Sequence, residues 1–196
     1  MGKAALREYM KDRETLSVSK AAQETGVSLP TVYSFLQAEG MERLSKGVYA
    51  RPAAWIDEMF MLSQRSKIIV FSHESALYLH NLADREPNAL TVTVPSNYNA
   101  GNLTKTGIRV YYVKPDLIDL GRVECETPES NQVPCYDLER TICDCVRSRR
   151  QLEEQLFFGA LKSYVRRNDK RLDTLASYAQ QLGISGVVSR FLEVLL

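Results

Sequence analysis

The sequence predicts an α+β protein in two parts. Three observations lead to this class. Helical spacing and a hairpin signal occupy the first 52 residues, four β-rich segments lie between residues 89 and 136, and helical spacing returns from residue 137 to the end. The chain of 196 residues is long enough for one large domain or two small ones. We therefore expect one domain over residues 1–52 and a second over residues 53–196.

The first 52 residues contain three short helical segments and a hairpin. Apolar spacing indicates a helix over residues 6–10, and the alanines at 21–22 belong to a second helix. Gly26 supplies the turn that ends this helix, and a third helix follows over residues 29–38. Two short strands around a Ser-Lys-Gly turn then predict a hairpin over residues 42–50. This order is typical of a winged helix-turn-helix.

The third helix has the pattern of a DNA-recognition helix. Val32 and Leu36 form its inner face, so residues at i, i+3, i+4 and i+7 from Pro30 share an outward stripe that can enter a major groove. The helix contains no Arg or Lys, which favours readout of A·T pairs and DNA shape, or a surface for protein contacts instead. Lys46, at the hairpin tip, is placed to contact phosphate. The expected DNA-binding residues are Lys20, Ser28, Leu29, Pro30, Tyr33, Ser34, Gln37, Arg43 and Lys46.

The second part is expected to begin with helices, continue as a small β-sheet and end as helices. An amphipathic segment with Trp55, Met59 and Phe60 precedes a helix that contains both histidines. From Asp137, which can cap a helix, apolar stripes with helical spacing reach the C-terminus. The expected strands are 89–95, 108–113, 122–126 and 132–136.

The histidines and cysteines do not predict a metal site. His73 and His80 lie two helical turns apart, about 10 Å along the axis, so one ion cannot bridge them. The cysteine spacing C-x9-C-x7-C-x-C lacks the paired knuckles of a structural zinc site. We therefore expect a helix with a structural role, no metal, no cofactor and four free thiols, at Cys125, Cys135, Cys143 and Cys145.

Three segments, "VFSHESALYLHNLAD", "LTVTVP" and "YDLERTICDCVRSRR", occur in this order after the predicted winged helix. Together they resemble the AbiEi family of antitoxins, which are also regarded as transcriptional regulators of viral defence systems. The resemblance covers nearly the whole chain. It implies an autorepressor that binds operator DNA in its own promoter through the N-terminal domain. It also implies a C-terminal domain that counters a nucleotidyltransferase toxin without a stable complex, the type IV arrangement of abortive-infection toxin–antitoxin systems.

The helical end is basic. Residues 146–196 carry nine Lys and Arg against five Asp and Glu, whereas residues 53–145 carry eight against thirteen. Arg140 and Asp144 are expected to pair at i, i+4. The cations form either a solvated face with partial ion pairing or a surface for a polyanion, which we name the antitoxin basic face. Its expected members are Arg140, Arg147, Arg149, Arg150, Lys162, Arg166, Arg167, Lys170 and Arg171.

Other classes are weakly supported. No apolar run approaches the roughly 18 residues of a membrane span, and the charged N-terminus is not a signal peptide, so we expect a cytoplasmic protein without membrane contact. No phosphate-binding loop and no nucleophile with a placed base predicts an enzyme. The alternatives are a nucleic-acid enzyme, such as a nuclease or transferase, targeted by the winged helix, and a ligand-sensing regulator. Without a long heptad we expect a monomer that binds inverted repeats in pairs.

Overall fold

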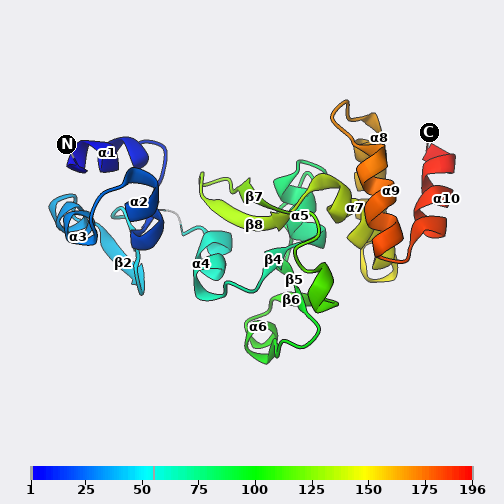
Figure 1. The fold of residues 1–196 in the computed structure, drawn as a ribbon, viewed down its shortest axis with the longest axis horizontal. Coiled ribbons are helices and arrows are strands. Elements are labelled where there is room, and N and C mark those ends of the chain that lie inside the picture. The colour runs from blue at the N-terminus through cyan, green and yellow to red at the C-terminus, as the bar shows by residue number, and fades with distance from the viewer. Residues whose placement is uncertain (1, 55, 196) are drawn as a thin grey trace. The chain divides into compact units, whose positions relative to one another are not determined.

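The computed structural model describes residues 2–54 and 56–195, with side chains up to residue 193 (Figure 1). The chain is an α+β protein that folds into two compact units. The first unit comprises residues 1–65 and 126–132, and the second comprises residues 66–125 and 133–196. Trp55, which the sequence places in an amphipathic helix, lies outside the described residues.

Three helices pack together in the first unit: α1 (Gly2–Tyr9), α2 (Val18–Thr25) and α3 (Leu29–Ala38). The predicted turn between α2 and α3 is confirmed, because Gly26 has a φ of 67° in the left-handed region that glycine adopts without steric cost. Fully or nearly fully buried apolar side chains from all three helices form one core, which includes Leu6, Ala21 and Val32.

A three-stranded antiparallel sheet completes this part of the unit. The predicted hairpin is confirmed as β2 (Glu42–Ser45) and β3 (Val48–Ala50), and β1 (Thr15–Ser17) pairs with the other edge of β3 to give the order β1-β3-β2. Strand β1, which has only three residues, was not predicted from the sequence. Leu16 lies opposite Tyr49, and its side chain is fully buried in the core of the three helices.

The first unit extends beyond residue 52 through a buried polar chain. The helix α4 (Glu58–Arg65) starts after Asp57, whose Oδ1 accepts from the Phe60 amide at 2.7 Å. Its Oδ2 accepts from the Thr127 hydroxyl at 2.5 Å and from the Asn131 side-chain amide at 2.9 Å. Asn131 in turn accepts from the Thr15 hydroxyl at 2.8 Å. Residues 126–132 therefore belong to the same unit as β1, although they are distant in sequence.

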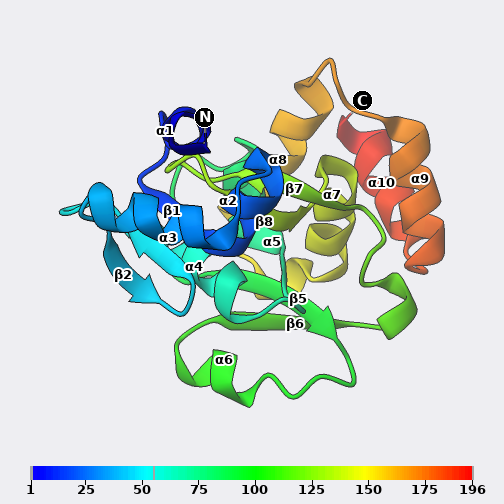
Figure 2. The same ribbon diagram turned by 60° about the vertical axis from the view of Figure 1, so that its left-hand side comes forward.

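The second unit is built on a five-stranded mixed sheet in the order β6-β5-β4-β8-β7. All four predicted strands are present, and a two-residue strand that was not predicted, β4, lies at the centre. Strand β4 pairs antiparallel with β5 and parallel with β8, while β5 pairs parallel with β6 after a crossover through α6 (Gly101–Lys105), as Figure 2 shows. The strand bounds are Val70–Phe71 (β4), Thr91–Pro95 (β5), Arg109–Val113 (β6), Arg122–Glu126 (β7) and Gln132–Tyr136 (β8).

Helices complete the second unit. A single apolar cluster joins α5 to the C-terminal helices, with Leu77, Ile142 and Leu175 all essentially buried. Asp137 caps α7 as predicted, because its side chain accepts from the Arg140 amide at 2.8 Å. The helices are α5 (His73–Leu79), α7 (Leu138–Arg147), α8 (Glu154–Arg166), α9 (Leu172–Gln181) and α10 (Ser185–Leu195), with 3-10 turns at Pro115–Leu117 and Arg149–Gln151.

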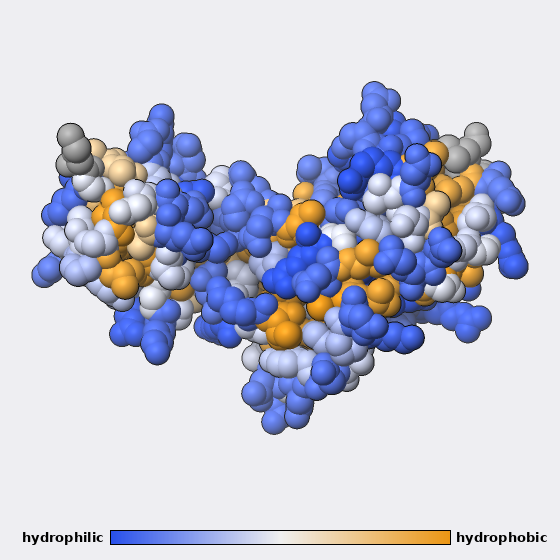
Figure 3. All heavy atoms as spheres, viewed as in Figure 1, coloured by the Kyte–Doolittle hydropathy of each residue, from blue (hydrophilic) through white to orange (hydrophobic). Residues whose placement is uncertain are grey.

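The helical end of the second unit has a mixed surface. In Figure 3 polar side chains cover much of the face over α8 and α9, and apolar atoms gather where α10 lies. Within residues 2–54 and 56–195, no helix combines the length and apolar character required to cross a bilayer.

Candidate functional site

The outward face of α3 is exposed in the first unit. Val32, Phe35 and Leu36 are buried, as their spacing requires. On the opposite side Leu29 is 51% exposed and Tyr33 is 48% exposed. The other members of the stripe, Pro30, Ser34 and Gln37, are exposed too. The Tyr33 ring packs edge-on against Tyr49, with ring centroids 6.3 Å apart, so this side chain is fixed against the sheet while its outer face stays accessible.

The cations expected around α3 have different environments. Lys46 is exposed in the turn between β2 and β3, and Arg43 is exposed with its Nε donating to the Ser45 carbonyl at 3.2 Å. Ser28 occupies the N-cap of α3, but its hydroxyl lies 2.9 Å from that of Thr31 and does not cap the helix. Lys20 is half-buried, and its Nζ donates to the Gln132 carbonyl at 3.1 Å. Its ammonium group is therefore held within the unit.

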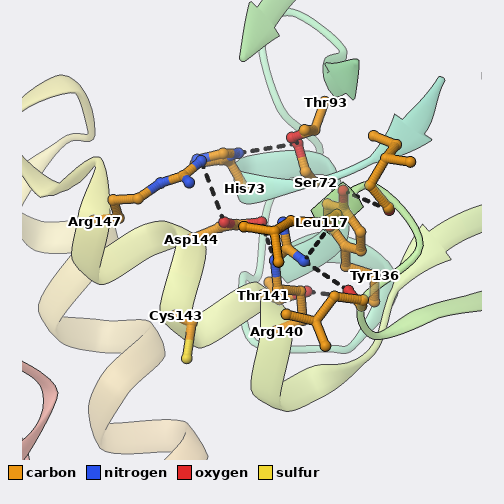
Figure 4. A network of polar contacts seen from close by, with 12 residues as sticks. Ser72, His73, Thr93, Leu117, Tyr136, Arg140, Thr141, Cys143, Asp144 and Arg147 are labelled. Atoms are coloured by element: carbon orange, nitrogen blue, oxygen red, sulfur yellow. Dashed lines mark hydrogen bonds and ion pairs between the residues drawn. The ribbon is translucent and has the colours of Figure 1, made fainter. Parts of the chain in front are cut away.

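Arg140 and Asp144 form the centre of a buried network in the second unit (Figure 4). Their predicted i, i+4 pair is confirmed, with Nε 3.1 Å from Oδ2, but both side chains are 0% exposed. Arg140 also donates to the Leu117 and Leu120 carbonyls at 3.0 and 2.7 Å, and its guanidinium carbon lies 4.1 Å from the Tyr136 ring centroid. Placing Arg140 on an exposed basic face was therefore wrong.

A glycine makes this burial possible. Gly121 has a φ of 73°, and a Cβ at this position would lie only 2.6 Å from Cβ of Arg140. Any larger residue would push the loop that contains Leu117 and Leu120 away from the guanidinium group. Charge pairing, two carbonyls and an aromatic ring then replace most of the water that Arg140 loses on burial.

Asp144 lies between two arginines. Its Oδ1 is 3.5 Å from Nη2 of Arg147, whose side chain is 27% exposed. Burial raises the pKa of Asp144, and the charges of Arg140 and Arg147 oppose this effect. Arg147 is consequently a partner of a buried carboxylate and only partly a surface cation.

His73 is fixed on all sides. It is fully buried, with Nδ1 2.9 Å from the Ser72 hydroxyl, Nε2 3.0 Å from the Ser148 hydroxyl, and its ring stacked on Tyr111 at a centroid distance of 3.4 Å. Burial, followed by the charges of Arg147 and Arg140, lowers the pKa of His73 well below its usual value. Its φ of 48° is unusual for a residue other than glycine and is maintained by these contacts. A buried neutral imidazole agrees with the structural role expected from the sequence.

A second group of acids pairs with another expected member of the antitoxin basic face, Arg171, whose side chain is 56% exposed. Glu139 is fully buried and accepts from the Arg171 backbone amide at 2.8 Å and from its guanidinium group. Arg171 also pairs with Asp137 at 3.0 Å, and the Tyr178 hydroxyl donates to the same carboxylate at 3.1 Å. Arg171 therefore joins the start of α9 to the start of α7, and its charge is already paired.

The remaining basic residues separate into paired and unpaired groups. Arg167 pairs with Asp169 at 2.6 Å, and Lys170 donates to the Arg167 carbonyl at 2.8 Å. The residues between 147 and 151 line a shallow hollow. Among the residues that the structure describes, five of the nine cations form no ion pair: Arg149, Arg150, Lys162, Arg166 and Lys170. The first four lie outside the segment that is bounded by the paired Arg167 and Arg171, and they are named the unpaired cations below.

His80, Cys125 and Cys135 form a cluster that was not predicted from the sequence. One donor atom from each residue lies within 4.8 Å of the other two, a geometry that can hold a metal ion. A hydrogen bond from Cys135 lowers the pKa of Cys125 to about 5, with His80 acting in the same direction against burial. Burial raises the pKa of Cys135 well above its usual value. Burial disfavours the charged form of His80 and so lowers its pKa. Hydrogen bonds to Cys125 and the Tyr136 carbonyl outweigh this effect, and the pKa of His80 is raised.

Comparison with known proteins identifies the fold alone. No family model matches the chain, and no curated protein matches it. The crystal structure of the RV2827C protein from Mycobacterium tuberculosis is similar, with a TM-score of 0.54 at 12% sequence identity. The similarity covers 91% of this chain and 71% of that one.

Proposed function

We propose that the protein is a DNA-binding transcriptional autorepressor and the antitoxin of an abortive-infection system. The observation that carries the DNA-binding part is the exposed stripe of α3 beside the β2–β3 turn. The element order α1-β1-α2-α3-β2-β3, with β1 paired to β3, supports this proposal, because winged helix-turn-helix domains have a similar order. In this assignment α3 is the recognition helix and the β2–β3 hairpin is the wing.

The exposed chemistry of α3 favours A·T-rich operators. The Gln37 amide can donate to and accept from an adenine edge, and Leu29 offers an apolar contact for a thymine methyl group. No residue of α3 supplies the arginine that most often reads guanine. Lys46 and Arg43 then contribute the sequence-independent attraction to phosphate.

The antitoxin part rests on the resemblance of three sequence segments to the AbiEi family, and the structure refines which residues can act. The buried Glu139, Arg140 and Asp144 of the "YDLERTICDC" segment hold the second unit together. A polyanion such as tRNA or a nucleotide would instead meet the four unpaired cations Arg149, Arg150, Lys162 and Arg166. These side chains would deny that ligand to a nucleotidyltransferase toxin without a stable protein complex.

The proposal describes a cytoplasmic protein that is not an enzyme and that binds inverted repeats as pairs of monomers. It assigns no catalytic residue. His73 is fully buried against Tyr111, so a substrate cannot reach its ring without local opening.

The test uses the full-length chain and two DNA duplexes, one from its own promoter and one with the same bases in shuffled order. We expect the promoter duplex to bind more tightly at every salt concentration, and both affinities to fall as salt rises because counterions are released. Equal affinity for the two duplexes across the salt series would reject the proposal that this protein is a specific repressor.

A further inference from the structure

Three soft metal-ligand side chains converge where α5 ends beside the hairpin of β7 and β8. His80 follows the last residue of α5, Cys125 lies in β7 and Cys135 in β8. Cys135 is fully buried, whereas His80 and Cys125 are half-buried. We propose that His80, Cys125 and Cys135 bind one Zn²⁺ ion and leave its fourth coordination position to water or to the Tyr136 carbonyl. This site is independent of the proposed DNA-binding and antitoxin functions.

The distances fit a tetrahedral ion. Zinc binds sulfur at about 2.3 Å and histidine nitrogen at about 2.0–2.1 Å, so neighbouring donors of a tetrahedral site lie about 3.5–3.8 Å apart. Nε2 of His80 and Sγ of Cys125 are 3.9 Å apart, and all three donor atoms lie within 4.8 Å of one another. Bringing them to an ion therefore requires movements of about 1 Å or less, as the bond lengths show.

The hairpin register favours a metal over a disulfide. The Thr127 amide donates to the Asn131 carbonyl at 2.8 Å, which places residue 127 opposite residue 131. Counting back along both strands, Cys125 lies opposite residue 133, and Cys135 is its diagonal neighbour on the same face. Diagonal pairs are separated by about 7–8 Å between Cα atoms, which exceeds the roughly 4.4–6.8 Å that a disulfide spans. Both cysteines are free thiols.

The ligand chemistry selects the class of ion. Two sulfur donors and one imidazole suit zinc and other soft cations, and they do not suit Mg²⁺ or Ca²⁺, which require oxygen. Nε2 of His80 lies 2.7 Å from the Tyr136 carbonyl, so this nitrogen carries the ring proton. Zinc binding moves that proton to Nδ1 and frees the Tyr136 carbonyl to face the ion. The Arg167 guanidinium, which donates to the His80 carbonyl at 3.1 Å, fixes the backbone at this ligand.

The experiment uses the full-length protein, kept reduced in metal-free buffer and titrated with ZnCl₂ against a chromophoric chelator. We expect about one tightly bound Zn²⁺ per chain, a higher melting temperature with zinc, and thiolate-to-metal absorption when Co²⁺ replaces zinc. Cys125→Ser should weaken zinc binding at least about 100-fold, since a change in a supporting residue alone costs about 10–100-fold. Cys143→Ala is the matched control, because this thiol lies on α7, hydrogen-bonded to the Leu175 carbonyl, and should leave zinc binding unchanged.

His80→Gln provides a second ligand variant if Cys125→Ser does not fold. A reduced protein that retains no zinc after gel filtration would overturn the proposal. So would a folded Cys125→Ser variant with unchanged zinc affinity. A Cys125–Cys135 disulfide in protein purified without reductant, combined with no zinc uptake by the reduced form, would assign this pair to redox chemistry instead.

Discussion

Arg140 and Asp144 form an ion pair one helical turn apart on α7 in which neither side chain is exposed to solvent. Pairs at this spacing usually lie on the outer face of a helix and contribute little. Here the helix is buried on both faces, because apolar residues such as Ile142 pack against the other helices while the charged pair lies under the loop around Gly121. The pair is thus part of the interior of the second unit.

We predict that Asp144→Ala lowers the free energy of unfolding by about 3–5 kcal/mol, because it leaves the Arg140 charge buried without its partner. Asp84→Asn, which removes an exposed carboxylate from a loop, should change stability by less than about 0.5 kcal/mol. Urea denaturation followed by circular dichroism measures both. If both substitutions have equally small effects, the carbonyls of Leu117 and Leu120 are sufficient partners for the Arg140 guanidinium group.

His73 should make stability depend on acid. Its folded pKa lies below the usual value, so the unfolded state binds a proton first as the pH falls below about 6.5. Stability is therefore expected to fall with decreasing pH by up to about 1.4 kcal/mol per pH unit from this residue. His73→Asn, which tolerates a positive φ and does not titrate, should remove that component.

The measurement compares unfolding free energies of the wild type and His73→Asn between pH 7.5 and 5.5. His80, Glu74 and Asp144 have raised folded pKa values and act in the opposite direction, but they are present in both proteins. The difference between the two curves therefore reports His73, with the charges of Arg140, Arg147 and Arg109 around it. Parallel curves would contradict a neutral buried imidazole.

Asn131→Ala should destabilise the first unit. It removes the acceptor for the Thr15 hydroxyl and one donor to Asp57, and each buried polar group left without a partner costs about 1–3 kcal/mol. We expect a loss of about 2–4 kcal/mol in a denaturant titration, with Asn97→Ala in an exposed loop as the control. An effect no larger than that of the control would mean that water readily replaces the amide.

Base readout and phosphate attraction should be separable on the first unit. Gln37→Ala is expected to reduce promoter binding by about 1–3 kcal/mol and to leave binding to shuffled DNA nearly unchanged. Lys46→Ala should weaken both duplexes and reduce the salt slope by about 1. Lys105→Ala removes the same charge from α6 and is the control for Lys46. If Lys46→Ala alters only sequence preference, the β2–β3 hairpin reads the bases and α3 contacts the phosphates, which is the reverse of the proposed roles.

Charge reversal should test the four unpaired cations of the second unit. We predict that changing Arg149, Arg150, Lys162 and Arg166 together to Glu abolishes protection in a co-expression assay with the cognate nucleotidyltransferase toxin. Promoter binding and the melting temperature should change little, because these side chains form no ion pair with the described residues. Arg147 stays unchanged because it pairs with Asp144. Full protection by the folded variant would show that these cations are merely solvated.

The sequence was most informative where local patterns determine structure. The Gly26 turn, the cap at Asp137 and the pairing of Arg140 with Asp144 each depend on residues within four positions of one another. The burial of Arg140 was not predictable from helical spacing, because it depends on carbonyls 20 and 23 residues away. The signal that could have indicated it is Gly121, which permits the close approach of that loop.

The cluster of His80, Cys125 and Cys135 was missed for a related reason. Metal-site spacings were considered separately for the two histidines and for the four cysteines. His80 and Cys125 are 45 positions apart and meet only after the sheet forms. The strands β1 and β4 escaped prediction because segments of two or three residues have no measurable alternation. The cluster and the two short strands all depend on pairing between distant segments, and a single sequence does not reveal such pairing.

The first unit is assembled from two separate stretches of chain, residues 1–65 and 126–132. This arrangement sets a rule for building chimeras. A fusion cut at a single junction after residue 52 would transplant Thr15 without Asn131 and would discard Asp57 with the rest of the chain. A chimera that carries the first unit on another scaffold therefore needs residues 126–132, the turn between β7 and β8, grafted together with residues 1–65, so that three crossover points replace one.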